Sequence, residues 1–427
     1  MKDLLMRDIA DFLQVDLEMF NNTLLTTTGT LSSEMKTHYN MTLIDNAWPE
    51  LVHDQFGQKK PIPKNKGKIV EFRKYSPLAK QTTALTEGTT PSGQALTVSV
   101  LTATVSQYGG YVEISDMLDM TAIDNNIVQA TMLLGHQAGE TLDTITRDII
   151  NGGSSVQYAN ADVAARYLLA GGSATPSLNH YFSVNAIRRA VRTLKVNKAK
   201  KIGGSYVAII HPDVSYDLMG DDDWVSISEY GKPGQIFEGE IGKIHGVRFV
   251  ETTEAKIFHA ADLVAVGSTN ATRNLTCASV NTKTFTMAEA LTAGEVTALI
   301  GRKVIIKGYK YTIASGAAGG AGAATLTVTE NVSGSPTTDV CYPGEAGALG
   351  RDVYSTLILG SDAYGTIDIE GGGLETIVKQ LGSSGTADPL NQRATVGWKA
   401  VKTAIRLVEG YMTRVETAST FDDQVAN

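Results

Sequence analysis

The sequence predicts a mixed α+β fold in which an extended β-ribbon leads into a long helix and an α/β region carries a small all-β insertion. Three patterns support this prediction. Two β-rich segments flank turn residues within 69–115, an amphipathic helical pattern covers 124–151, and short alternating segments rich in threonine and valine fill 267–350. The chain of 427 residues, of which 42 are glycine, is long enough for two or three domains.

The ribbon consists of two legs joined by a tip. The first leg is Ile69–Tyr75 and the second covers residues 96–105, both rich in residues that favour strands. Residues 87–93 between them have turn chemistry. Because an isolated hairpin is at best marginally stable in water, we expect the ribbon to lie on a neighbouring subunit. The candidate residues of this inter-subunit strap are Lys80, Glu87, Gly88, Pro91 and Gly93.

The helical pattern that follows has start and stop signals. Asp124 is a competent N-cap, and Gly152 with Gly153 predicts a left-handed C-terminal cap. Gly135 and Gly139 lie four residues apart, each costing up to about 1 kcal/mol relative to alanine, which indicates close backbone packing across that face. An ordinary buried helix that tolerates two glycines is an equally good interpretation. The apolar stripe is Ile127, Leu134, Ala138, Leu142, Ile145 and Ile149, and a membrane span is excluded by Glu140, Asp143, Arg147 and Asp148.

The remainder of the chain alternates helical and strand patterns. We predict a helix over 184–198, a buried strand at Tyr206–Ile210 with a turn at 211–212, and a turn and strand within 239–251. Further strands are predicted at 263–266, 354–359, 397–401 and 406–415. The glycine-rich segment 316–324 lacks the GK[ST] ending of a phosphate loop and is predicted to be a hairpin tip.

Two basic runs stand out against a net charge of −8. The first comprises Lys59, Lys60, Lys64, Lys66, Lys68, Arg73 and Lys74; the second comprises Arg188, Arg189, Arg192, Lys195, Lys198, Lys200 and Lys201. Either run could meet phosphates. The absence of interleaved aromatic residues favours solvated faces, or partners for an acidic patch such as residues 221–223 on a neighbour.

No catalytic or ligand-binding constellation is evident. The seven histidines are scattered, no nucleophile elbow occurs, and the two cysteines, Cys277 and Cys341, are predicted to be free thiols in a reducing cytoplasm. Residues 221–223 are only a minor candidate for a cation, because consecutive carboxylates point in different directions. The N-terminal pattern is unlike a signal peptide. We therefore expect no enzyme activity, no cofactor and no metal.

A resemblance to a known family rests on three segments and their order. These are residues 29–40 (GTLSSEMKTHYN), 239–251 (GEIGKIHGVRFVE) and 388–399 (DPLNQRATVGWK), taken together with the ribbon. Their order resembles a tailed-phage major capsid protein of the Hong Kong 97 fold, in particular the coat proteins named after coliphage N-four.

The resemblance implies a division of the chain into parts. Residues 1–56 would be an N-terminal arm with a helical extension, and 57–115 the extended loop. Residues 116–175 and 376–427 would form a peripheral domain with the spine helix at 124–151. Residues 176–266 and 351–375 would form the axial domain, with 267–350 inserted as a β-rich module.

It also implies a function and a set of partners. The chain would assemble through pentamers and hexamers into an icosahedral shell around phage double-stranded DNA, which it would contact without sequence recognition. The candidate inner basic patch is Lys59, Lys60, Lys64, Lys66 and Lys68. Scaffolding, portal and decoration proteins would be further partners, no membrane would be involved, and assembly would take place in the host cytoplasm. Some relatives join Lys and Asn covalently, so Lys80 and Asn391 are a candidate pair, although most relatives lack the bond.

Three other classes were weighed. A bacterial nanocompartment shell shares the fold, but such shells use shorter chains and the insertion argues against it. A β-rich surface adhesin is suggested by the threonine-rich module, and the lack of a signal peptide and of tandem repeats argues against it. An enzyme lacks any convergent polar cluster.

Overall fold

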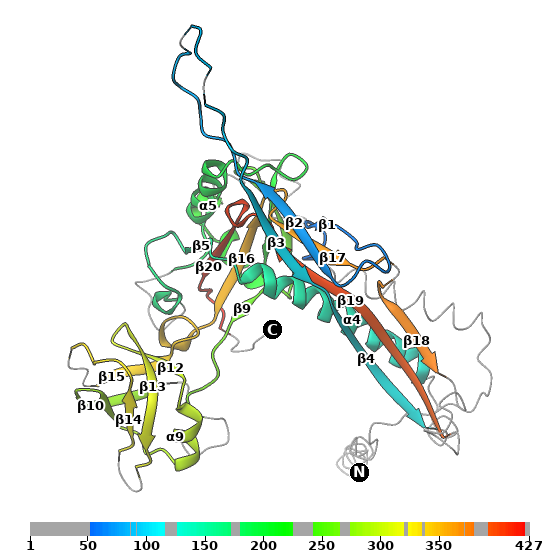
Figure 1. The fold of residues 1–427 in the computed structure, drawn as a ribbon. Coiled ribbons are helices and arrows are strands. Elements are labelled where there is room, and N and C mark those ends of the chain that lie inside the picture. Colours follow the sequence, from blue (N-terminus) through cyan, green and yellow to red (C-terminus); the bar gives the residue numbers. More distant parts are fainter. Residues whose placement is uncertain are drawn as a thin grey trace. The chain divides into compact units, whose positions relative to one another are not determined.

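The computed structural model describes residues 52–85, 87–90, 92–115, 126–171, 180–224, 242–264, 274–319, 323–334, 338–370, 372–379 and 392–422 (Figure 1). The predicted helical extension, most of the arm and the segment 29–40 lie outside these residues. The chain divides into two compact units. Unit 1 comprises Met1–Gln55, Lys59–Thr146 and Gly365–Ile405, and unit 2 comprises Phe56–Gln58, Arg147–Tyr364 and Arg406–Asn427. The domain boundaries implied by the resemblance stay predictions.

The sheet of unit 1 is organised around one long strand. Strands β1 (Gln58–Lys59), β17 (Tyr364–Asp368), β19 (Arg393–Arg406) and β18 (Glu375–Lys379) follow in this order, and β4 (Ser106–Ser115) also pairs with β19. The sequence predicted two strands, at 397–401 and 406–415, and both exist with different bounds: β19 extends well beyond 397–401, and the second strand is Met412–Thr417. Strand β19 continues through Lys402 because that residue pairs with Ser106 of β4, and its buried ammonium bonds Asp54.

Helix α4 (Asn126–Asn151) packs on this sheet through a stripe of small and apolar residues. Ala130, Leu134, Ala138 and Leu142 share a buried cluster with alternate residues of β19, which are Ala394, Val396, Trp398 and Ala400. The helix period of 3.6 and the strand period of two thus place both stripes in one core. Trp398 donates its indole N–H to the Gln137 side chain over 3.0 Å. Nothing is described of Asp124, the predicted N-cap.

The end of α4 differs from the prediction. The helix stops at Asn151 as expected, but neither Gly152 nor Gly153 has a positive φ, so the predicted left-handed cap was wrong. Instead, the Arg406 guanidinium donates to the Ile149 carbonyl over 2.5 Å. A Cβ on Gly152 would lie 2.9 Å from that guanidinium. A side chain at this position would displace the flexible end of Arg406, so Gly152 leaves room for that contact, and its backbone conformation does not require glycine.

Unit 2 contains a seven-stranded mixed sheet. The order is β5 (Val156–Tyr158), β20 (Met412–Thr417), β16 (Val353–Leu359), β6 (Tyr206–Ile210), β8 (Val247–Glu251) and β7 (Lys243–Ile244), and β9 (Ile257–Phe258) pairs with β16. The prediction of a fully buried strand at Tyr206–Ile210 is confirmed, since all five residues are buried. Helix α5 (Val184–Val196) contributes Ile187, Ala190 and Leu194 to the core of this sheet.

The predicted turn at residues 211–212 is the start of helix α6 (Pro212–Met219). Proline at the first helical position is pre-organised for a helix, and the His211 ring accepts the backbone N–H of Asp213 over 3.3 Å as an N-cap. Pro212 was predicted to reverse the chain direction, but a proline is also a common first residue of a helix. The predicted strand at 263–266 is described only as far as Val264, which is not part of a named strand.

The inserted segment forms a closed barrel of six strands. They are β10 (Leu275–Asn281), β11 (Thr284–Met287), β14 (Thr325–Val328), β13 (Tyr309–Ala317), β12 (Lys303–Ile306) and β15 (Asp339–Pro343), in order around the barrel. The glycine-rich segment joins β13 to β14, as a hairpin connection should. The prediction of an all-β module was wrong in one respect, because helix α9 (Ala293–Leu299) places Val296 and Leu299 in the barrel core. The sequence pattern that marks the start of this helix is the capping box formed by Thr292 and Glu295.

Two chemical features of the barrel concern its titratable groups. Cys277 and Cys341 are free and buried, and burial raises the pKa of both thiols. The backbone N–H of Thr312 donates to the Glu330 carboxylate over 2.8 Å and is the main reason why the pKa of Glu330 is lowered to about 2.

Within the described part of the chain, no helix is long and apolar enough to span a membrane.

Candidate assembly surface

The predicted ribbon exists as a sheet of its own. Strands β2 (Ile69–Tyr75) and β3 (Val98–Thr104) pair with each other alone, in antiparallel register from Ile69 opposite Thr104 to Tyr75 opposite Val98 (Figure 1). The first leg therefore has the predicted bounds. Backbone bonds from Val105 to Lys68 and from Ser76 to Thr97, both 2.9 Å long, extend the ladder at its two ends. The ribbon is regular although it has no neighbouring strand.

The two faces of the ribbon differ in how far they are covered. Residues directly opposite each other in an antiparallel pair share a face, so Phe72 lies beside Leu101 and Val70 beside Ala103. On this face Phe72 and Ala103 are buried, with 8% and 7% of their surface exposed. The Lys60 ammonium lies 5.3 Å from the centre of the Phe72 ring. This face is closed within the chain.

The opposite face carries apolar side chains that this chain leaves uncovered. Ile69 (57% exposed), Tyr75 (62%), Val98 (42%) and Val100 (50%) all point to it. We call these four residues the open ribbon face. Clusters of exposed apolar residues on one surface mark protein interaction sites. The open ribbon face is therefore a candidate contact surface for another protein.

The tip of the ribbon also exposes apolar side chains. Leu78, Leu85 and Leu96 are more than half exposed. The legs of the tip enclose a pocket of about 540 Å³, and Leu78 and Leu85 are among the residues that line it. Of the strap candidates, Lys80, Glu87, Gly88 and Gly93 are exposed in this region, and Gly88 has a φ of +78°; Pro91 lies outside the described residues. Asn391 also lies outside them, so the covalent pair with Lys80 stays a prediction.

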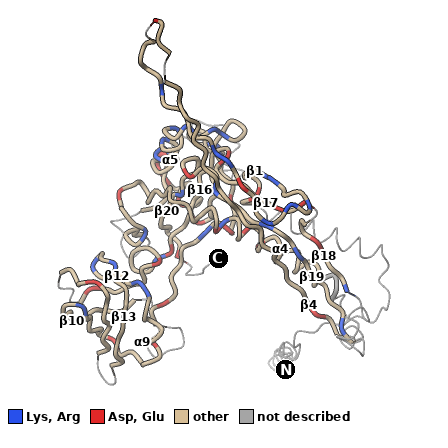
Figure 2. The backbone as a smooth tube through the Cα atoms, in the orientation of Figure 1, with Lys and Arg blue, Asp and Glu red and all other residues tan. Residues whose placement is uncertain are grey.

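The candidate inner basic patch lies at the base of the ribbon (Figure 2). Lys59, Lys60, Lys64, Lys66 and Lys68 are all exposed. Asn65 and Gly67 between them have positive φ values of 66° and 88°, which makes this segment a sequence of tight turns. Lys64, Lys66 and Lys68 therefore stand exposed on an irregular loop, whereas Lys59 ends strand β1 and Lys60 lies over the Phe72 ring.

The two glycines predicted to pack the spine helix are both buried in α4. Gly135 follows Leu134 and Gly139 follows Ala138, two residues of the core stripe. Burial fits either interpretation of the sequence, so the close backbone packing of Gly135 and Gly139 stays a prediction.

A buried polar network on α4 escaped the sequence analysis. His53, the last part of the predicted arm, donates its backbone N–H to Asp143 over 2.8 Å, and its ring Nδ1 lies 2.6 Å from the other carboxylate oxygen. Both residues have no exposed surface. Asp54 accepts from the Thr146 hydroxyl over 2.8 Å and pairs with Lys402. Asp143, which from the sequence only interrupts an apolar stripe, fixes the chain just before the ribbon begins.

The described residues hold no group of three or more side chains that could bind a metal ion. Asp221, the first of the acidic triplet, accepts the backbone N–H of Val184 at the start of α5 over 2.9 Å. Its role in the structure is therefore to cap a helix.

Comparison with known proteins shows which family and which solved structures this chain resembles. Residues 98–280 match the model of a family described as phage capsid protein. The capsid of Ralstonia phage GP4 is similar in structure with a TM-score of 0.53 at 11% identity, over 87% of this chain and 89% of that one. The capsid of cyanophage Pam1 gives a TM-score of 0.52 at 12% identity, over 94% of this chain and 96% of that one. No curated protein matches the chain.

The fold is thus the Hong Kong 97 type found in phage capsids, as the sequence predicted. The family match covers residues 98–280 and the structural likeness shows the fold, so the role of a tailed-phage major capsid protein is taken up as a proposal below. The prediction of a structural protein and not an enzyme agrees with the phage capsid family that residues 98–280 match. The narrower resemblance, to the coliphage N-four group, stays a prediction.

Proposed function

We propose that the chain assembles through pentamers and hexamers into an icosahedral shell that encloses phage double-stranded DNA. The observation that carries this proposal is the open ribbon face: four apolar side chains on one side of an isolated ribbon, which are 42–62% exposed in the part of the chain that the structure describes. A second copy of the chain is the partner that a capsid protein meets most often. Each ribbon laid across a neighbour would add one contact of the same kind per copy.

Such contacts suit a closed shell. Each one buries a limited apolar area, and a shell repeats it once per copy, so weak contacts sum to a stable particle. The tip residues, among them Lys80, Glu87, Gly88 and Gly93, would reach furthest onto the neighbour. This function needs no reactive group, because repeated contacts between copies are enough to form and stabilise the shell.

The partners other than the chain itself follow from the same proposal. The exposed lysines at the base of the ribbon would line the interior and contact the packaged DNA through its phosphates, with affinity that falls as salt rises. Scaffolding and portal proteins, and a decoration protein on the outside, would join during assembly in the host cytoplasm.

The proposal is tested by electron microscopy of the purified protein together with sedimentation. Thin-walled polyhedra, or rings of five and six copies that close into them, are the expected result. A matched variant replaces residues 76–97 with a two-residue Asn-Gly turn, which retains β2 and β3 but removes the tip. This variant should form rings or small aggregates and no closed shells. A wild-type chain that stays monomeric at high concentration and high salt would contradict the proposal.

The interior DNA contact has a test of its own. Replacing Lys64, Lys66 and Lys68 by glutamate should lower affinity for a short duplex and reduce its dependence on salt by about three ion contacts. Unchanged binding would assign the DNA contact to another surface.

A further inference from the structure

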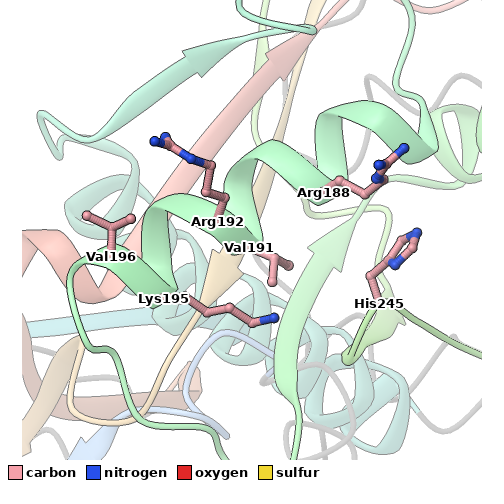
Figure 3. A pocket seen from close by; sticks show the side chains of 6 residues that line it. All are labelled: Arg188, Val191, Arg192, Lys195, Val196 and His245. Carbon is pink, nitrogen blue, oxygen red and sulfur yellow. The ribbon is translucent and has the colours of Figure 1, made fainter.

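The second basic run gathers around a pocket on helix α5. The pocket has a volume of about 500 Å³ and is lined by Arg188, Val191, Arg192, Lys195, Val196 and His245. Figure 3 shows that the first five come from α5 and that His245 comes from the turn between β7 and β8. We call this set the α5 basic pocket.

The charges of the α5 basic pocket have no counter-charge in the part of the chain that the structure describes. Arg188, Arg192 and Lys195 occupy one side of the helix at intervals of four and three residues, and all three are exposed. Neither they nor His245 make an ion pair or a side-chain hydrogen bond with any described residue. Like charges held around one hollow repel each other, and an anionic partner would relieve that repulsion.

The charges of α5 are also separated along its axis. The acidic turn of residues 221–223 lies at the start of the helix, where Asp221 accepts the Val184 N–H over 2.9 Å. Asp222 and Asp223 are exposed there. The basic side chains continue to the far end, to Lys195 in the last turn and Lys198 beyond it. A helix of 13 residues is about 20 Å long, so Lys195 in the last turn is far from the acidic turn of its own chain, whereas Arg188 lies about one turn from the start of the helix.

The helix dipole explains only part of this pattern. An acid at the start and a base in the last turn each stabilise a helix. The dipole effect is confined to the first and last turns, so it gives no reason for Arg188 and Arg192. It also gives none for His245, which comes from a different element and adopts a positive φ of 47°.

We propose that the α5 basic pocket of one copy receives the acidic turn 221–223 of the next copy around a capsomer ring. The contact is heterologous, since two different surfaces meet, and such contacts generate a closed ring when the rotation between copies closes. Every copy supplies one basic pocket and one acidic turn, so in a ring the basic side chains of each pocket meet the exposed carboxylates of Asp222 and Asp223 on a neighbour. The apolar side chains of Val191 and Val196 in the lining favour a protein partner, whose aliphatic groups can contact them, over an inorganic phosphate.

This inference rests on the proposed function, because it names the contact within the assembling ring. The test compares Arg192→Glu with Arg189→Glu, an exposed arginine of the same helix that does not line the pocket. Asp223→Lys and the double variant Arg192→Glu with Asp223→Lys complete the set. Assembly is measured by light scattering and by sedimentation at two salt concentrations, and circular dichroism confirms folding.

Each single reversal in the proposed contact, Arg192→Glu or Asp223→Lys, should raise the protein concentration needed for assembly on the order of tenfold at low salt, and less at high salt. Arg189→Glu should behave as wild type. The double variant should restore assembly, because the exchanged charges attract again in every contact of the ring.

Wild-type shells together with an unaffected Arg192→Glu variant would overturn this inference and leave the proposed function intact. A damaged Arg192→Glu variant that Asp223→Lys does not rescue would also overturn it. Loss of binding to a short DNA duplex in that variant would then assign the pocket to phosphates. A wild-type chain that never forms rings contradicts the inference and the proposed function together.

Discussion

Replacing two residues of the open ribbon face should weaken assembly without unfolding the chain. Ile69→Thr with Val100→Thr keeps β-branched side chains that suit a strand, but removes apolar surface on the exposed side. Fully burying such a side chain contributes roughly 1.5–3 kcal/mol, and about half of each is already covered within the chain. A neighbour that covers the rest would therefore gain about 1 kcal/mol per residue, or about 2 kcal/mol per copy.

A loss of about 2 kcal/mol corresponds to roughly a 30-fold weaker contact. The protein concentration at which particles appear in sedimentation should rise accordingly, while the thermal unfolding of the unassembled chain stays the same. Val340→Thr is the matched control, since it removes the same methyl group from a partly exposed valine of the barrel. If the double variant and the control assemble at the same concentration, the open ribbon face is not an assembly contact.

Two further predictions concern stability. His53→Ala should destabilise the chain by about 3 kcal/mol or more in urea unfolding, because Asp143 keeps a buried carboxylate without its ring partner. Replacing both residues by leucine should cost less, and an equal cost would contradict the pairing argument. Glu330→Gln should lower the melting temperature at pH 7 and have a much smaller effect at pH 2, where about half of the carboxyl groups are protonated in the folded state. The folded-state pKa of about 2 lies below the unfolded value, so the stabilisation is present above about pH 4.3 and is lost as pH falls towards 2. The same difference at both pH values would refute this explanation.

The elements that sequence analysis placed correctly are those whose own residues determine them. Strand β2 and strand β6 have their predicted bounds, because β-branched residues and continuous apolar character are local properties. The ribbon was likewise predicted as an isolated pair, since a long hairpin between turn signals has few alternatives. The barrel's hairpin connection was clear from its glycines.

The elements that were misjudged depend on partners far away in sequence. Strand β19 extends beyond its predicted end because Lys402 pairs with Ser106 of β4, and the Lys402 ammonium also pairs with Asp54, 348 residues earlier. Gly152 has no positive φ, and the group nearest to it is the Arg406 guanidinium, which comes from a distant part of the sequence. His53 and Asp143 are 90 residues apart and look like unrelated surface residues until the fold joins them. Which face of the ribbon would stay open also required the register of β2 against β3.

The way the barrel is inserted has a consequence for how this protein can change. Its first and last strands are neighbours, with Leu275 opposite Cys341, and the host strands on either side of it also pair, with Phe258 opposite Val353. The hydrogen bonds between these two host strands therefore do not depend on the barrel. An exchange of this segment for another domain with adjacent ends would leave the host ladder intact and add little loop-closure cost. The barrel is therefore an exchangeable inserted domain. Its sequence can diverge, and the whole segment can be deleted or replaced by another domain, while the host sheet keeps its fold.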